Sequence, residues 1–146
     1  MNLNKLIRTS IKGIKAYSSA RDEYTDLHAD MVFLDANENP FDTPLNRYPD
    51  PQQTILKSLI SKQKEVSTDQ ILLGNGSDEV LDLIFRAFCE PNQDSVLTLP
   101  PTYGMYEVLA NLNAVETIQV PLSLGFQLEA DAILAAIKPN TKLLFI

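Results

Sequence analysis

One stretch, residues 71–79, constrains the fold of this chain more than any other. An apolar segment, Ile71 to Leu73, meets the glycine turn Gly74 to Gly76, and a helical pattern of apolar residues follows the turn. Glycine tolerates backbone angles that a Cβ atom would forbid, so the turn can be tight. The stretch therefore predicts a strand, a turn and a helix that Ser77 or Asp78 caps.

The start of this helix is a candidate phosphate site. Free N–H groups in the first turn and the positive end of the helix dipole attract anions. The backbone amides and the Ser77 hydroxyl would bind the phosphate, so the acidic side chains of Asp78 and Glu79 do not exclude it. No lysine follows the turn, and the complete dinucleotide fingerprint is missing. Taken alone, the turn is more typical of an ordinary capped helix, and the phosphate site needs support from other residues.

The composition narrows the class of protein. The 146 residues are 45% hydrophobic and 21% charged, which is typical of a globular domain, and the formal net charge is -7. The negative charge argues against nucleic acid and against an anionic membrane as partners. No apolar run could span a bilayer, the single cysteine, Cys89, excludes an internal disulfide, and His28 has no ligand-like spacing for a metal. We expect a cytoplasmic protein with no metal site.

Helical and strand-like patterns alternate along most of the chain. Such alternation predicts an α/β fold in which helices cover a mainly parallel sheet. There is no internal repeat. The expected helices cover residues 3–11, 51–65, 78–89, 103–112 and 130–137, and the expected strands cover 31–34, 71–73, 95–99, 116–120 and 142–146.

The chain divides into two parts by pattern. Residues 1–51 contain polar and proline-rich loops and predict an extended arm with little core of its own. Residues 52–146 carry the regular alternation and predict the first part of a larger domain. The last apolar run, Leu143 to Ile146, predicts a strand with neither a loop nor a covering helix after it, so we expect a longer polypeptide.

A second loop of interest follows the strand expected at 95–99. The run Pro100 to Tyr106 and the glycine turn both come after a strand's carboxyl end, which is where open parallel sheets bind ligands. Tyr103 has a flat ring that could stack on a planar cofactor, although aromatic packing at a helix start explains it equally well. Tyr17 with Arg21, and Arg47 with Tyr48, carry donors suited to phosphate or carboxylate groups, but singly each is more typical of a surface residue.

Together these motifs resemble the histidinol-phosphate aminotransferase family, which are pyridoxal-phosphate enzymes of fold type I. The resemblance extends from about Tyr17 to the last residue. Glycine turns of this kind recur across fold type I, whereas the Asn-Arg-Tyr-Pro loop combined with the Pro-Pro-Thr-Tyr-Gly-Met-Tyr run is more specific. The matching runs are Leu34 to Pro40, Asn46 to Asp50, Gly74 to Glu79, Arg86 to Pro91 and Pro100 to Tyr106.

The resemblance implies an incomplete large domain like that of aspartate aminotransferase, a three-layer α/β/α sandwich with a mainly parallel sheet. It implies pyridoxal 5'-phosphate as the cofactor. Gly76, Ser77 and Asp78 would hold the cofactor phosphate, and Tyr103 would stack on the pyridine ring. Tyr48 would reach the cofactor phosphate of the other subunit in a homodimer.

The resemblance also implies the substrates, histidinol phosphate with 2-oxoglutarate or glutamate, in histidine biosynthesis. Tyr17 would contact the substrate phosphate and Asn37 would line the substrate side. No lysine of the chain has the family's Schiff-base context, so no catalytic residue is assigned and we expect the isolated chain to be inactive. Two alternatives stay open: another fold-type I enzyme, such as a threonine-phosphate decarboxylase or an amino-acid aminotransferase, and a non-catalytic phosphate-binding module.

Overall fold

The structure is a computed structural model, and it describes residues 3–18, 32, 34 and 36–146. The described residues form two compact units. The larger unit joins the residues up to Ile14 to those from Gly74 to Ile146, and the smaller unit lies between Lys15 and Leu73. The strand expected over 31–34 falls partly outside the described residues, and His28 and Arg21 fall wholly outside them.

The larger unit is built on a parallel sheet of three strands in the order β2-β1-β3. The strands are β1 (Ser95–Thr98), β2 (Glu116–Gln119) and β3 (Thr141–Leu144). All four residues of β1 are buried, because β1 is paired on both edges and covered on both faces. The parallel pairing confirms the sheet expected from the alternation of strands and helices.

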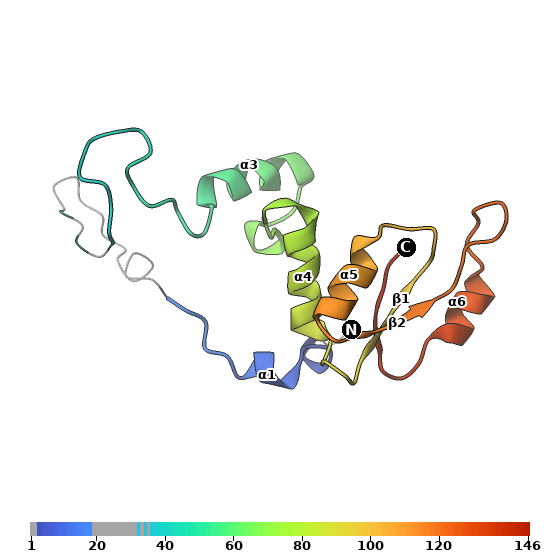
Figure 1. The fold of residues 1–146 in the computed structure, drawn as a ribbon. Coiled ribbons are helices and arrows are strands. Elements are labelled where there is room, and N and C mark those ends of the chain that lie inside the picture. Colours follow the sequence, from blue (N-terminus) through green and yellow to red (C-terminus); the bar gives the residue numbers. More distant parts are fainter. Residues whose placement is uncertain (1–2, 19–31, 33, 35) are drawn as a thin grey trace. The chain divides into compact units, whose positions relative to one another are not determined.

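Helices cover both faces of this sheet, which gives three layers (Figure 1). Val96 of β1 packs with α4 (Gly76–Phe88) and α5 (Met105–Leu112), whereas Leu97 packs with α6 (Ala130–Ala136) on the other face. Successive side chains of a strand point to opposite faces, which explains this division. The connection β1-α5-β2 and the returning connection β2-α6-β3 run in opposite directions, so right-handed crossovers place their helices on opposite faces.

The elements agree with the sequence-based expectation to within about three residues at each end, the usual uncertainty of element ends. The exceptions lie at two places. Ile71–Leu73 was expected to be a strand, but it makes no ladder with any described strand, although Ile71 is extended (φ -114°, ψ 120°). An extended segment becomes a strand only when a neighbour accepts its hydrogen bonds.

The second exception is the helix expected over 3–11, which is two short pieces, a 3-10 turn at Leu3–Lys5 and α1 at Thr9–Lys12. Arg8 separates them with extended backbone (φ -53°, ψ 142°).

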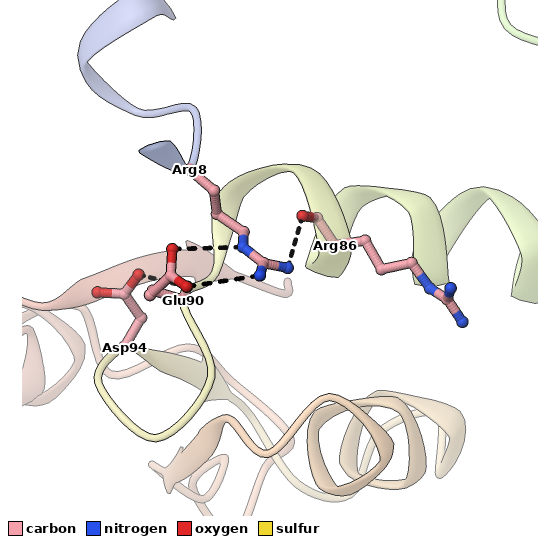
Figure 2. Close-up of polar contacts among 4 residues, drawn as sticks. All are labelled: Arg8, Arg86, Glu90 and Asp94. Carbon is pink, nitrogen blue, oxygen red and sulfur yellow. Dashed lines mark hydrogen bonds and ion pairs between the residues drawn. The ribbon is translucent and has the colours of Figure 1, made fainter. Parts of the chain in front are cut away.

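Arg8 attaches this amino-terminal segment to the end of α4 (Figure 2). Its backbone N–H donates to Ala87 O (3.0 Å), and its guanidinium donates to Arg86 O (3.0 Å). The same guanidinium pairs with the Glu90 carboxylate (Nε–Oε2 3.4 Å), while Asp94 accepts the Glu90 N–H (2.7 Å). The last carbonyl groups of a helix lack intrahelical hydrogen-bond partners and carry negative potential. A cationic side chain there supplies both hydrogen-bond donors and a compensating positive charge.

The smaller unit contains α3 (Thr54–Lys64) and a 3-10 turn, Thr68–Gln70. α3 begins at Thr54, and the carboxylate of Asp50 just before it accepts the N–H groups of Thr54 and Gln52 (2.8 Å each). The hydrogen bonds from Thr54 and Gln52 lower the pKa of Asp50. Apolar side chains of α3 are exposed, with Ile55 80% and Leu59 60% exposed.

The boundary predicted between residues 51 and 52 differs from the division into compact units, which groups 3–14 with the sheet and 52–73 with the smaller unit. The boundary stays a prediction. No helix in the described part of the chain is long and apolar enough to cross a bilayer.

Candidate functional site

The start of α4 differs from the sequence-based prediction in its first residue and in its cap. The helix begins at Gly76, with Asn75 at the N-cap position and no side-chain cap bond, so the prediction that Ser77 or Asp78 caps it is wrong. Gly76 has φ +79°, a backbone angle that a glycine adopts readily and other residues rarely do. The carboxylate of Glu79 instead reaches back and accepts the Asn75 N–H.

The two glycines of the turn have different surroundings. A Cβ atom on Gly74 would lie 2.8 Å from Val80 Cγ2 and 2.9 Å from Glu79 Oε2, so the backbone packs closely against α4 there. A Cβ atom on Gly76 would meet nothing within 4 Å. The first-turn amides of α4, including those of Ser77 and Asp78, lack intrahelical partners. The turn therefore presents N–H groups beside open space.

Tyr103 lies against this first turn. Its hydroxyl donates to Asp78 Oδ1 (3.0 Å), and the Ser77 hydroxyl lies 3.5 Å from the same oxygen. The hydrogen bond to Asp78 raises the pKa of Tyr103, and its ring is 50% exposed. The structure thus brings four of the predicted site residues together, namely Gly76, Ser77, Asp78 and Tyr103.

A cavity of about 170 Å³ lies next to Tyr103. It opens at the carboxyl ends of β1 and β2, the end of a parallel sheet where ligands bind. The Pro100–Pro101 peptide bond in its wall is cis. The lining residues are Thr98, Pro100, Pro101, Thr102, Tyr103, Gly104, Tyr106, Glu107 and Gln119.

The smaller unit holds the other predicted site residues, Tyr17, Asn37 and Tyr48. Tyr17 is 91% exposed and Tyr48 is 60% exposed. The structure brings the loops of Asn37 and Tyr48 together through Glu38, whose carboxylate accepts the Tyr48 N–H and a hydrogen bond from Arg47 (2.8 Å each). Tyr17 makes no such contact within the described residues.

Glu38 is the residue that sequence reasoning missed. Its side chain is only 6% exposed, and it pairs with the Arg47 guanidinium, which was considered a donor for a ligand. In the sequence, an acidic residue inside a polar turn, nine positions before an arginine, only weakly indicates an ion pair between the two. The pairing shows that Arg47 orders the loop that carries Tyr48.

Two further residues have plain structural explanations. Cys89 is fully buried, and burial together with Asp94 raises the pKa of its thiol to about 11, so it is a core residue. Lys62 follows Ser61 in a Ser-Lys pair. It is exposed in the last turn of α3, and the Ser61 hydroxyl donates to Val66 O (2.5 Å).

Comparisons with a family model and with individual relatives both match aminotransferases. A family model described as aminotransferase class I and II matches residues 22–146. A histidinol-phosphate aminotransferase of Flavobacterium psychrophilum is 59% identical over 145 residues, covering 99% of this chain and 42% of the relative. Its counterpart in Bacteroides thetaiotaomicron is 56% identical over 144 residues, covering 99% of this chain and 41% of the relative.

The chain therefore spans about two-fifths of the length of these relatives. Among solved structures, a protein of Burkholderia pseudomallei titled as an aminotransferase superposes with a TM-score of 0.56 at 20% identity. That match covers 74% of this chain and 37% of the other, and it shows the same fold.

Proposed function

This chain belongs to the family of class I and II aminotransferases, and we propose that it holds the coenzyme of a histidinol-phosphate aminotransferase, pyridoxal 5'-phosphate. The name of its relatives, which are more than half identical to it, supports this choice within the family. The whole protein would move an amino group between L-histidinol phosphate and 2-oxoglutarate. Bound pyridoxal phosphate supplies an electron sink for chemistry at the α-carbon of the amino substrate.

The residues at the start of α4 fit the phosphate group. The amides of Gly76, Ser77 and Asp78 and the hydroxyl of Ser77 would hold it, with the helix dipole adding to the attraction. The open space beside Gly76, where a Cβ atom would meet nothing within 4 Å, leaves room for the approach of a ligand. The carboxylates nearby are engaged, since Asp78 binds Tyr103 and Glu79 binds the Asn75 N–H.

The observation that carries the proposal is the 3.0 Å hydrogen bond from the Tyr103 hydroxyl to Asp78. It ties an aromatic ring that is 50% exposed to the helix turn whose amides suit a phosphate. A planar coenzyme with a phosphate arm needs this combination, because the phosphate fixes one end and the ring face covers the other. Tyr103 would orient the pyridine ring and exclude water from one of its faces.

We assign the smaller unit to the substrate and to the second subunit of a homodimer. Tyr48 would contact the coenzyme phosphate of the partner subunit, Tyr17 the substrate phosphate, and Asn37 the substrate side. The exposure of Tyr17 and Tyr48, and the hydrogen bond that links the Tyr48 loop to Glu38, support these roles. A preorganised loop loses less entropy when it binds.

Coenzyme binding by the complete gene product tests the proposal. Tyr103→Ala should weaken pyridoxal phosphate binding by about two- to tenfold, because aromatic stacking contributes roughly 0.5–1.5 kcal/mol beyond area burial. Tyr103→Phe keeps the ring and should retain most of the affinity. Titration followed by coenzyme fluorescence measures both. Equal affinity of Tyr103→Ala and the unchanged protein would mean that the ring does not stack.

A substrate panel then distinguishes the family members. The complete protein with 2-oxoglutarate should turn over histidinol phosphate faster than threonine phosphate or common amino acids. Carbon dioxide release from threonine phosphate would identify a decarboxylase instead. A protein that binds phosphate compounds but transfers no amino group would be the non-catalytic module.

A further inference from the structure

A row of four aromatic rings runs from Tyr103 into the core of the larger unit. The Tyr103 ring meets Tyr106 edge-on, with centroids 5.7 Å apart and an interplanar angle of 87°. Tyr106 stacks on Phe145 at 4.2 Å and 13°, and Phe145 stacks on Phe85 at 5.6 Å and 23°. Edge-on and stacked pairs at these distances are the favoured aromatic geometries.

Both ends of this row of rings are connected to α4. Its far end, Phe85, belongs to α4, and its near end, Tyr103, is hydrogen-bonded to Asp78 of the same helix. Residues 78 and 85 are two helical turns apart and therefore lie on one face. Tyr103 is thus tied to α4 twice, directly by its hydroxyl and indirectly through Tyr106, Phe145 and Phe85.

The inner members of the row are firmly placed, whereas the outer one is not. Phe85 is fully buried, and Phe145 packs against the same core cluster and donates its N–H to Leu97 O (3.0 Å). Tyr103 is 50% exposed and precedes α5, in the loop after β1. A ring held only by its hydroxyl could pivot about that hydrogen bond. The edge of Tyr106 opposes such pivoting.

We propose that Tyr106 is a positioning residue, whose ring, supported by Phe145, holds the Tyr103 ring at the angle needed to cover the coenzyme. This inference rests on the proposed function, in which Tyr103 stacks on pyridoxal phosphate. The Tyr106 hydroxyl makes no hydrogen bond with any residue that the structure describes, so the ring carries the role. Preorganisation of this kind raises affinity by removing an ordering cost from binding.

A double-mutant cycle on coenzyme binding by the complete gene product tests the coupling. Tyr106→Leu should weaken pyridoxal phosphate binding by about two- to tenfold, the range of an aromatic pair. Tyr106→Phe should bind normally. In a Tyr103→Leu background, Tyr106→Leu should have no further effect, because Tyr106 acts only through Tyr103. The same loss in both backgrounds would reduce Tyr106 to a packing residue and overturn the inference.

Leu112→Ala serves as the matched control, because Leu112 lies at the other end of α5 and is 74% exposed. It should leave coenzyme binding unchanged. The circular dichroism that the protein induces in the bound coenzyme, normalised to the amount bound, reports the geometry of the ring contact. It should fall in Tyr106→Leu and stay in Tyr106→Phe. If Tyr106→Leu does not fold, Tyr106→Met, which is more adaptable in packing, replaces it.

A second measurement judges the inference without coenzyme. The hydroxyl of Tyr103 stays bonded to Asp78 while its ring is held by the edge of Tyr106, so the ring itself is the part that should loosen. Tyr106→Leu should increase the mobility of the Tyr103 ring, as followed by carbon NMR relaxation of labelled tyrosine, and Tyr106→Phe should not. Unchanged mobility of the Tyr103 ring in Tyr106→Leu would overturn the inference. Failure of the unchanged protein to bind pyridoxal phosphate would instead overturn the proposed function.

Discussion

At the scale of single residues, the candidate phosphate site depends on missing Cβ atoms. Gly74 permits close packing of the backbone against Val80 and Glu79, and Gly76 supplies a left-handed backbone angle. Together they let the backbone lie close beside α4 at Gly74 and leave open space next to Gly76. The site is therefore built mainly from backbone, and side chains contribute at its edge.

Replacement of Gly76 tests this account. Gly76→Ala should lower the free energy of unfolding by about 1–2 kcal/mol, because an L-residue at φ +79° is strained even where space is open. Gly104→Ala is the matched control, since Gly104 has φ -62° and open space around its Cβ position, and it should be neutral. Urea unfolding measures both. Equal costs for the two variants would show that the backbone angle is not the cause.

At the scale of elements, α4 is fixed at both ends by residues distant in sequence. Tyr103 binds its first turn, and Arg8 binds its last carbonyls (Figure 2). Helix ends leave backbone groups unsatisfied, so partners from other elements determine where a helix is held. The orientation of the first-turn amides follows from this.

The Arg8 side chain should contribute measurably to the free energy of unfolding. Arg8→Ala removes hydrogen bonds to the Arg86 carbonyl and the Glu90 carboxylate, so it should lower the free energy of unfolding by about 1–2 kcal/mol. Arg8→Lys should lie between, because an ammonium group cannot reproduce the guanidinium fork. Lys12→Ala, an exposed change in α1, is the control and should be neutral in thermal and urea unfolding. A neutral Arg8→Ala would contradict the role of this contact.

Replacing two threonines, one in each outer strand of the described sheet, by valine should have opposite effects on the free energy of unfolding. Thr117 Oγ1 in β2 is buried without a hydrogen-bond partner among the described residues, so Thr117→Val should be neutral or stabilising by up to about 1 kcal/mol. Thr141 Oγ1 in β3 bonds to Ser95 Oγ (3.1 Å) and accepts the Lys138 N–H (2.9 Å). Thr141→Val should therefore cost about 1–2 kcal/mol. Urea unfolding that ranks the two variants the other way would refute this assignment.

At the scale of the whole molecule, the 146-residue polypeptide expressed alone should show no transamination. It holds the proposed coenzyme cradle and stacking ring, but none of its lysines has the context of the family's catalytic lysine, and Lys62, which follows Ser61, is exposed on α3. A coupled glutamate assay with histidinol phosphate and 2-oxoglutarate measures this, with the complete gene product as the positive control. Turnover by the purified polypeptide alone would show that this chain contains the missing base.

The amino-acid pattern alone predicted the class of fold, the parallel sheet, the ends of most elements to within a few residues, and the family. Local periodicity and turn chemistry encode these features, because they depend on neighbours along the chain. It also singled out Gly76, Ser77, Asp78 and Tyr103, although the roles assigned to them stay proposals.

The contacts among these residues became visible only in the three-dimensional fold. Tyr103 and Asp78 are 25 positions apart, and Arg8 and Glu90 are 82 apart. Whether Ile71–Leu73 joins a sheet likewise depends on a neighbouring strand, which periodicity does not reveal. Contacts at such separations form only when the sheet and its helices have brought distant segments together, which is the physical reason why the pattern of the chain could suggest the members of the site but not their contacts.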